Sequence, residues 1–287
     1  MSELGLILAL GCAALSGVAQ LCKHRGAVAA PDVAMRRPLR SAAGLFRSRW
    51  WLIGFGLAFL AWCLYVAALS MAPLSVVQTV IAGGLALLAF PARRWFGLAV
   101  GRRELIGLVL CASGLAFLAL TAGQGRAGGG FTGSTMMAFE GGALALGGFL
   151  MLASAHRRLR GRGWLLLATA AGTCLGVSDV ALKALAETVP GSLVDIVSPW
   201  TVVAILGGIG GFLALARALQ LGDAVAVIVA FSATATLAAI AGGILVFGDP
   251  LGSDPLTVVT RSTAFLSVIA AAAVLPMYPK VVREASR

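Results

Sequence analysis

Long runs of apolar residues alternate along this chain with short polar connections. A run of about 18 to 25 apolar residues is long enough to cross the hydrocarbon core of a bilayer as a helix. The sequence contains nine such runs and therefore predicts an all-α, polytopic membrane protein with nine transmembrane helices. The expected spans are Leu4–Leu21, Trp51–Leu69, Leu74–Phe90, Leu105–Thr121, Thr135–Ala155, Trp164–Ala184, Ile196–Ala216, Ala224–Phe247 and Leu256–Pro276.

The composition agrees with a membrane protein. Apolar residues make up 60% of the 287 residues and the mean hydropathy is +0.97, whereas about half of a soluble domain is apolar. The 37 glycines fit the same class, because closely packed transmembrane helices rely on small residues. No basic residue precedes the first apolar run, so we expect it to remain as a span and not to be removed as a signal peptide. The chain 1–287 is then a single transmembrane domain.

Basic residues gather in every second connection. The formal net charge is +11, which in a soluble protein would suggest a nucleic-acid partner. Here 19 of the 22 lysines and arginines fall in alternate connections and in the C-terminal tail. Because cytoplasmic connections carry the excess of positive charge, this pattern predicts an outside N-terminus, an inside C-terminus and a location in the cytoplasmic membrane. Topology thus accounts for the charge, and no nucleic-acid partner is expected.

The connection 23–50 is long and mixes arginines with apolar residues. One interpretation is a broken amphipathic helix that lies among anionic lipid headgroups. The other is a solvated loop that the Trp50-Trp51 pair anchors at the membrane surface. The sequence alone leaves both open.

A faint similarity relates the ends of the first and sixth spans. The first closes with GVAQLCK, from Gly17 to Lys23, and the sixth with GVSDVALK, from Gly176 to Lys183. In this alignment Gln20 corresponds to Asp179. The neutral amide and the acid therefore occupy equivalent positions in the two segments.

Further matches extend this similarity to an internal repeat. At a spacing of 150 residues, Trp50 matches Trp200. We therefore expect a first repeat at 4–121 and a second at 164–276, with the span at 135–155 between them. Because equivalent helices are offset by five spans, an odd number, the repeats would be inverted in the membrane. Inverted repeats are typical of transporters that alternate around a site near the midplane.

Three longer segments carry a family resemblance. They are AALSMAPLSVVQ at 67–78, DVALKAL at 179–185, and ALQLGDAVAVIVAF followed by GGILVFGDP within 218–250. With the repeat, they make nearly the whole chain resemble the drug/metabolite transporter superfamily, and within it the nine-helix NIPA-type and EamA-like branch. This resemblance implies secondary transport of a small solute across the cytoplasmic membrane by alternating access. Resemblance to the NIPA-type branch implies magnesium or another divalent cation as the alternative.

Four ionisable residues lie within or near the expected spans. They are Glu140, Asp179, Lys183 and Arg261. A charge inside a span is costly and marks a functional site by default. At about 1.5 Å per residue, all four fall in the outer half of the membrane. We therefore expect them to supply the substrate or coupling-ion site.

Each acid has a second interpretation. Glu140 is either a proton or cation site or a carboxylate held in place by Arg261 or by nearby backbone groups. Asp179 and Lys183 share a helix face at i and i+4, and form either a gate or a permanent ion pair. For a divalent-cation pathway, Glu140 and Asp179 would be the oxygen ligands.

The remaining polar positions give weaker expectations. Uncharged or aromatic side chains expected to line a cavity are Gln20, Gln78, Tyr65, Trp62 and Ser232. The five cysteines lie in or beside apolar runs and are expected to be buried. His24 and His156 fall in arginine-rich inner connections, and no phosphate-binding loop is present, so we expect neither an enzyme nor a cofactor. A lipid or lipid-linked sugar translocator is a further alternative, in which Lys183, Arg261 and the connection 23–50 would hold anionic headgroups.

Overall fold

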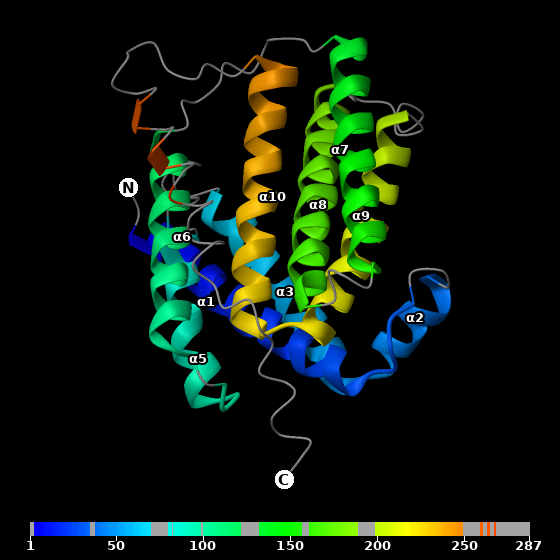
Figure 1. The fold of residues 1–287 in the computed structure, drawn as a ribbon. Helices are drawn as coiled ribbons and strands as arrows, with labels where there is room; N and C mark the ends of the chain where they lie inside the picture. Colours follow the sequence, from blue (N-terminus) through cyan, green and yellow to red (C-terminus); the bar gives the residue numbers. More distant parts are fainter. Residues whose placement is uncertain are drawn as a thin grey trace.

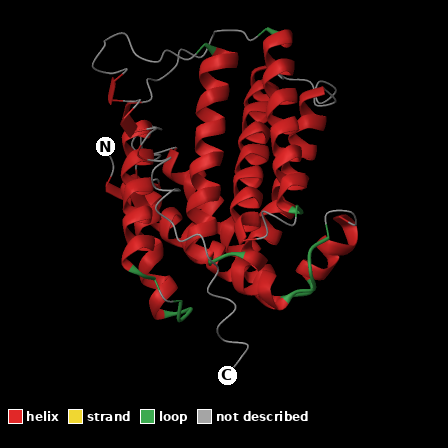
Figure 2. Cartoon of the chain, in the orientation of Figure 1, coloured by secondary structure: helices red, strands yellow, loops and turns green. Residues whose placement is uncertain are grey.

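The computed structural model of the chain is helical throughout the residues that it describes. These are 3–34, 38–69, 80–81, 83–98, 100–121, 132–156, 161–188, 199–248, 259–260, 263–264 and 267, and none of them lies in a strand (Figures 1 and 2). The helices are α1 (Glu3–Ala29), α2 (Pro38–Phe46), α3 (Arg49–Leu69), the 3₁₀-helix η1 (Leu85–Leu88), α5 (Ala89–Arg94), α6 (Arg102–Thr121), α7 (Gly133–Ser154), α8 (Gly163–Thr188), α9 (Pro199–Leu221) and α10 (Ala224–Phe247).

Five of these helices are long and apolar enough to cross a membrane, so the chain is a multi-pass membrane protein. The candidate spans are Leu4–Ala29, Gly133–Ser154, Gly163–Ala181, Pro199–Leu221 and Ala224–Phe247. The apolar stretches described in α3 and α6 are shorter, at Arg49–Tyr65 and Glu104–Phe117. Of the third expected span, residues 74–79 and 82 lie outside the described residues, as does most of the ninth. Nine crossings therefore remain a prediction.

The observed bounds match the expected spans best where local signals are strong. The bounds of α10 are those expected, Ala224 to Phe247. By contrast, α1 does not end at Leu21 but continues to Ala29. The expectation that His24 lies in a connection was therefore wrong, and the reason is tertiary. The last turns of α1 pack against α9, where the Ala27 carbonyl accepts a hydrogen bond from Gln220.

The ends of many helices meet at one end of the bundle, which we call the basic end. Here α1, α7 and α9 end and α3, α8 and α10 begin, at the lower side of Figure 1. The start of α8 lies against the end of α7, because a Cβ on Gly163 would lie 3.3 Å from the Ser154 carbonyl oxygen. The connection after α5 joins them through the Phe96 ring, whose centroid is 6.3 Å from that of Trp50. The structure thus brings the connections before α3, after α5, before α8 and before α10 to one side of the bundle.

The α2 helix confirms the helical interpretation of part of the connection 23–50. It buries Leu45 fully and leaves Leu39 86% exposed. Within α2, the Ser41 hydroxyl accepts a hydrogen bond from the N–H of Ala34, which precedes the helix, and donates one to the Ala34 carbonyl, both at 3.0 Å. The short helix is therefore anchored by one apolar side chain and one local hydrogen-bonded turn.

Glycines allow α8 to approach two helices closely. A Cβ on Gly172 would lie 2.6 Å from the Phe231 carbonyl oxygen of α10, and one on Gly176 would lie 2.7 Å from the Ala235 carbonyl oxygen. On another face, a Cβ on Gly207 of α9 would lie 2.8 Å from the Cys174 carbonyl oxygen of α8. Since these neighbours are backbone atoms, any side chain would force the helices apart.

The first and third helices pack in the same manner. A Cβ on Gly54 of α3 would lie 2.8 Å from the Ala19 carbonyl oxygen and 2.9 Å from the Lys23 amide nitrogen of α1. Further along, Gly26 of α1 lies against the Trp51 backbone. The two helices are antiparallel, because residues late in α1 meet residues early in α3.

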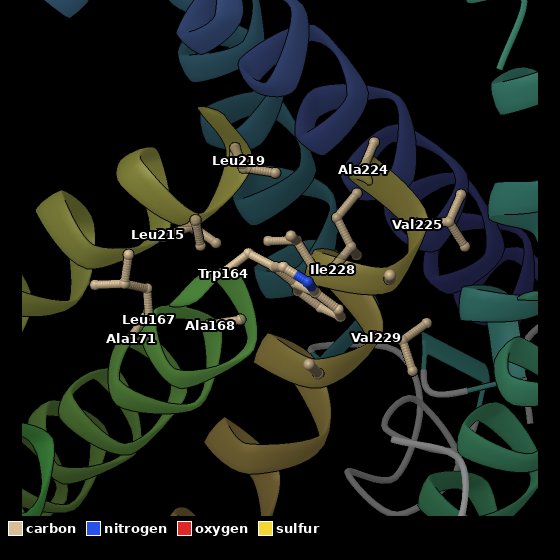
Figure 3. Packing of buried hydrophobic residues seen from close by; sticks show 14 of the residues in the cluster. Trp164, Leu167, Ala168, Ala171, Leu215, Leu219, Ala224, Val225, Ile228 and Val229 are labelled. Atoms are coloured by element: carbon tan, nitrogen blue, oxygen red, sulfur yellow. The ribbon is translucent and has the colours of Figure 1, made fainter. Parts of the chain in front are cut away.

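The largest apolar core lies at the basic end. Trp164, at the start of α8, is surrounded by Leu167, Ala168 and Ala171 of α8, Leu215 and Leu219 of α9, and Ala224, Val225, Ile228 and Val229 of α10 (Figure 3). Gly222 lets the chain turn between α9 and α10 directly beneath this ring, since a Cβ there would lie 2.9 Å from the Trp164 Cβ. The core therefore joins α8, α9 and α10 where their ends meet.

Large apolar side chains are exposed on the outward faces of several helices. Examples are Leu152 at 78%, Phe149 at 66% and Leu245 at 66%. Lipid tails cover such faces in a membrane protein. Cys63 is exposed on the same face of α3 as Phe59, so the expectation that all five cysteines are buried was wrong for this one. The other four are buried, and all five are free thiols.

Candidate functional site

Glu140 is a buried acid within a candidate membrane span. Its side chain is 2% exposed, and its Oε1 has no hydrogen-bond partner among the described residues. The buried positions of α7 are Met136, Glu140 and Gly147, which form a single stripe at helical spacing. Gly141 and Gly142 follow on the exposed side, where a Cβ would meet nothing within 4 Å. The carboxyl group therefore belongs to the inward face of α7.

The surroundings of Glu140 are the apolar surface of α8. Gly147 meets Cys174, whose Sγ lies 2.7 Å from the position of a Cβ, and Met136 packs in a cluster with Ala184. Because α7 and α8 are antiparallel, Glu140 faces the part of α8 between these contacts, which includes the fully buried Val177 and Ala181. An ionised carboxylate in such surroundings costs roughly several kcal/mol unless a proton or a cation accompanies it.

One polar side chain on this stretch of α8 already has a partner. Ser178 is 6% exposed, and its hydroxyl donates a 2.8 Å hydrogen bond to the Ala204 carbonyl of α9. Its hydrogen is therefore directed toward α9. The α7–α8 contact thus combines an acid with an apolar wall.

Asp179 lies on the opposite side of α8 from Glu140. Successive residues of α8 point 100° apart around the helix axis. One direction is toward α10, which meets Gly172 and Gly176, and another is toward α9, which meets Cys174 and Ser178. Asp179 projects between them, away from the side that faces α7, and it is exposed. The structure therefore does not bring the two acids together, although both were expected in one site.

The remaining candidates from the sequence are dispersed. Gln78 and Arg261 lie outside the described residues, as does the side chain of Lys183, so the Asp179–Lys183 pair stays a prediction. Trp62 is 58% exposed and stacks on Phe59 with ring centroids 5.9 Å apart. Tyr65 is partly buried and packs against the small cluster of Ala9 and Ala68, and Ser232 is partly buried on α10.

Gln20 lies on the face of α1 that meets the second part of the chain. Its helical neighbours on this face are His24, whose ring lies near the Leu219 backbone of α9, and Ala27, whose carbonyl accepts from Gln220. The Gln20 Oε1 and the His24 Nδ1 are both buried without a hydrogen-bond partner in the described part of the chain. The face thus carries two buried acceptor or donor atoms available to a ligand or water.

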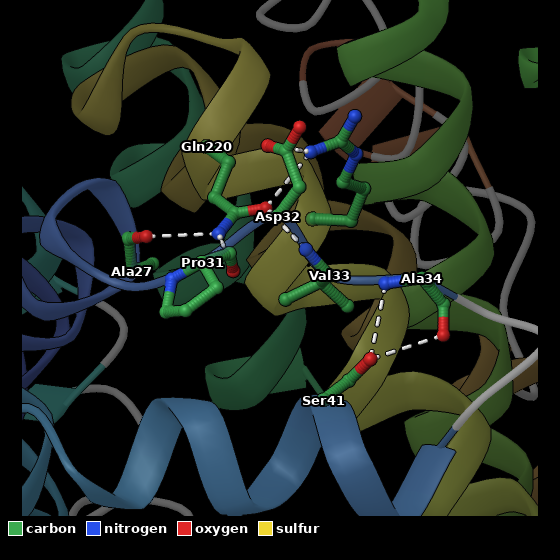
Figure 4. A network of polar contacts seen from close by, with 8 residues as sticks. Ala27, Pro31, Asp32, Val33, Ala34, Ser41 and Gln220 are labelled. Carbon is green, nitrogen blue, oxygen red and sulfur yellow. Dashed lines mark hydrogen bonds and ion pairs between the residues drawn. The ribbon is translucent and has the colours of Figure 1, made fainter.

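A polar clasp that sequence reasoning missed joins α9 to the connection after α1 (Figure 4). We call it the basic-end clasp and define it by Asp32, Arg217 and Gln220. The Gln220 amide donates to the Ala27 and Pro31 carbonyls at 2.9 and 3.1 Å and accepts from the Val33 N–H at 3.0 Å.

The charged members complete the clasp. The Arg217 guanidinium donates to the Asp32 carboxylate at 2.7 Å and to the Gln220 side-chain oxygen at 3.0 Å. Asp32 is 88% exposed, so its ion pair is solvated and weak. The partly buried amide of Gln220 is thus the stronger structural element, because three of its four hydrogen bonds are made to backbone groups.

Two other acids have structural roles at helix starts. Asp223 accepts hydrogen bonds from the Val225 and Ala226 N–H groups at 3.0 and 3.4 Å, which makes it the N-cap of α10. Glu104 is buried in the first turn of α6, with its Oε2 2.5 Å from the position of a Cβ on Gly101. It thus folds back toward the helix start, where a negative charge is favourable.

The described residues contain no group of three or more His, Cys, Asp or Glu side chains placed to hold a metal ion. Compared with known protein families, with curated proteins and with solved structures, the chain has no match.

Proposed function

We propose that this protein is a secondary transporter that moves a small solute across the cytoplasmic membrane by alternating access, with Glu140 as the proton-coupling residue. The observation that carries the proposal is the burial of Glu140 at 2% exposure within a candidate span, with Oε1 unpartnered among the described residues. A polar group that is buried without hydrogen bonds that would stabilise the fold is typical of functional sites. The apolar wall of Val177 and Ala181 offers few oxygen ligands for a metal ion, which favours a proton.

The packing of α1 on α3 supports an inverted repeat as the architecture of this transporter. The sequence alignment shifts α1 onto α8 by 159 residues and α3 onto α9 by 150. These shifts carry Ala19 to Ser178 and Gly54 to Ala204. Ala19 contacts Gly54 in the first pair, and Ser178 hydrogen-bonds Ala204 in the second. The two shifts come from the sequence alone, yet they convert a contact between α1 and α3 into a contact between α8 and α9.

The third helix of each repeat supports the same relation. Gly17 of α1 contacts Leu88, since a Cβ would lie 3.4 Å from its Cδ1. Shifted by 159 and 150 residues, this pair becomes Gly176 and Ala238, whose Cβ lies 2.6 Å from the Cβ position of Gly176. Likewise, the contact of Gly84 with Ala13 becomes that of Thr234 with Gly172. Because α1 ends at the basic end where α8 begins, the two sets run in opposite directions, as inversion requires.

Repeat symmetry gives Gln20 and Asp179 matching places. Gln20 is on the face of α1 that meets α9, and Asp179 is on the face of α8 directed between α9 and α10, away from α7. Gln20 therefore faces the opposite repeat, and Asp179 occupies the equivalent position in the second repeat. We infer that these two residues contact the solute, whereas Glu140, on the far side of α8, carries the proton.

The basic-end clasp supports a specific state of the transport cycle. It holds the end of α1, in the first repeat, to the end of α9, in the second. With the basic end on the cytoplasmic side, as the distribution of lysine and arginine predicts, this contact favours a state closed toward the cytoplasm. When Glu140 gains or loses its proton, α7 and α8 change their preferred contact, and α8 carries Asp179 with it.

The test uses proteoliposomes that enclose a pH-sensitive dye. A panel of amino acids, nucleosides, sugars and quaternary amines is added outside, and solute-dependent proton flux is recorded. We expect flux with at least one solute for the wild type, none for Glu140→Gln, and unchanged flux for the matched control Glu104→Gln, which alters the other buried glutamate. Full flux in Glu140→Gln would contradict the proposal. Magnesium flux that depends on both Glu140 and Asp179 would replace it by the divalent-cation alternative.

A further inference from the structure

A pocket at the basic end lies on a segment that the transport proposal does not use. It has a volume of about 440 Å³ and is lined by Ala89, Phe90, Arg93 and Arg94. All four residues belong to α5, which follows the 3₁₀-helix η1 and precedes the turn into α6. The pocket is open at the surface, so its lining side chains are accessible from outside the bundle.

The α5 helix is anchored on one face and free on the other. Pro91 and Ala92 are buried, and their carbonyls accept hydrogen bonds from the backbone N–H groups of the turn that follows, at 2.9 to 3.3 Å. Phe90, Arg93 and Arg94 are exposed and share one face at i, i+3 and i+4. The pocket is therefore built on a short helix whose position the core fixes.

The charge of this face is positive. Neither the Arg93 nor the Arg94 guanidinium has a hydrogen-bond or ion-pair partner among the described residues. From Leu85 to Arg103 the sequence contains four arginines and no acid. A guanidinium presents a planar set of donors that matches phosphate oxygens in two-point contacts. The face is thus complementary to a phosphate group.

The apolar side chains beside the pocket indicate the source of that phosphate. Phe90 is 66% exposed and Trp95 61%, and their rings meet edge to face with centroids 6.3 Å apart. Leu87, one turn before Phe90, is 44% exposed. A free anion makes no use of such a surface, whereas tryptophan and phenylalanine at the boundary of the bilayer lie between headgroups and acyl chains.

We propose that this pocket binds the headgroup phosphate of an anionic phospholipid, with Arg93 and Arg94 as its ligands. The start of an acyl chain lies along Phe90 and Leu87. The pocket is at the basic end, where Phe96 packs on Trp50 and the Arg25 guanidinium lies 4.4 Å from the Trp50 ring centre. The lipid therefore comes from the leaflet on that side. The site is independent of transport, since it contains none of the residues assigned to it.

The test titrates the full chain in nonionic detergent with dioctanoyl phosphatidylglycerol and follows the rise in melting temperature. Dioctanoyl phosphatidylcholine and inorganic phosphate are the comparison probes. We expect saturable binding of the anionic lipid at concentrations at least about tenfold below those needed for either comparison probe. Arg93→Gln with Arg94→Gln should weaken binding roughly tenfold to thirtyfold. Arg93→Lys with Arg94→Lys should retain most of it, because charge is kept.

The control pair is Arg40→Gln with Arg47→Gln, which removes the same charge from exposed positions in and beside α2. We expect it to weaken binding less than threefold. An equal loss in this pair would show diffuse attraction and overturn the proposal, as would equal affinity for phosphatidylcholine or for inorganic phosphate. If the glutamine pair fails to fold, Phe90→Ser decides instead. It should weaken binding of phosphatidylglycerol without changing that of phosphate, and unchanged lipid binding would overturn the proposal.

Discussion

The polar residues of the basic end have hydrogen-bond partners, whereas the acid in α7, Glu140, lacks one for its Oε1 among the described residues. Gln220 makes four hydrogen bonds to side-chain and backbone groups, and Asp223 caps α10 through two N–H groups. Glu140 is more deeply buried than either, yet its Oε1 meets no donor among the described residues. Burial alone therefore does not separate structural from functional polar residues in this protein.

This difference indicates that the hydrogen bonds of the basic end stabilise the fold, whereas the burial of Glu140 destabilises it. A buried polar group with partners contributes about 1 kcal/mol per hydrogen bond, and the loss of one partner leaves the other uncompensated. A buried carboxyl group without partners contributes nothing and costs desolvation. Substitutions at the basic end should therefore lower stability, whereas a neutral substitution of Glu140 should not.

The largest effect on stability is expected for Gln220→Leu. This change keeps the side-chain volume but leaves the Ala27 and Pro31 carbonyls and the Val33 N–H without their partner. We expect a loss of about 3 kcal/mol in the free energy of unfolding, measured by thermal or denaturant melting in detergent. Asp32→Asn is the control from the same clasp and should cost below about 1 kcal/mol, because that ion pair is solvated. Equal losses would mean that the ion pair, and not the amide, holds the clasp.

A smaller effect is expected for Asp223→Ala. The substitution removes the acceptor for the first N–H groups of α10, and loss of such a cap costs about 1 kcal/mol. Asp223→Ser, which can still accept a hydrogen bond at this position, should restore most of the stability. The same melting experiment measures both variants, and a serine variant as unstable as the alanine variant would rule out capping as the cause.

The smallest effect on stability is expected for Glu140→Gln. Glutamine has nearly the same shape and removes only the ability to ionise, so we predict an unchanged or slightly higher melting temperature. Glu104→Gln, which weakens a favourable charge at the start of α6, should lower stability by about 0.5 kcal/mol. A fall for Glu140→Gln as large as that for Gln220→Leu would assign Glu140 a structural partner and would remove the distinction between the two regions.

Local signals in the sequence predicted the parts of the fold that depend on short segments. The bounds of α10 follow from an apolar run that begins after Asp223, whose side chain is a good N-cap, and ends at Gly248, which adopts a positive φ of 68°. Glu140 was recognisable because an acid interrupts an apolar run. Both inferences need only residues that are close in the chain.

Features that depend on distant partners were missed. Gln220 donates a hydrogen bond to the carbonyl of Ala27, 193 residues away, and no sequence pattern around either residue predicts that contact. The extension of α1 to Ala29 has the same origin. The separation of Glu140 from Asp179 also requires knowledge of which helix packs on which face of α8. Spacing along α8 gives the direction of each side chain, but not the neighbour it meets.

The central claim is that Glu140 carries a proton in an apolar contact between α7 and α8. An apolar carbodiimide tests it most directly, since this reagent enters the membrane and modifies neutral carboxyl groups that water does not reach. The full chain in proteoliposomes is treated, digested and mapped by mass spectrometry. The account predicts that Glu140 is modified even when a protonophore has collapsed the proton gradient. It predicts little modification of Asp223 or Asp32. Absence of modification at Glu140, with modification of the solvated acids, would contradict it.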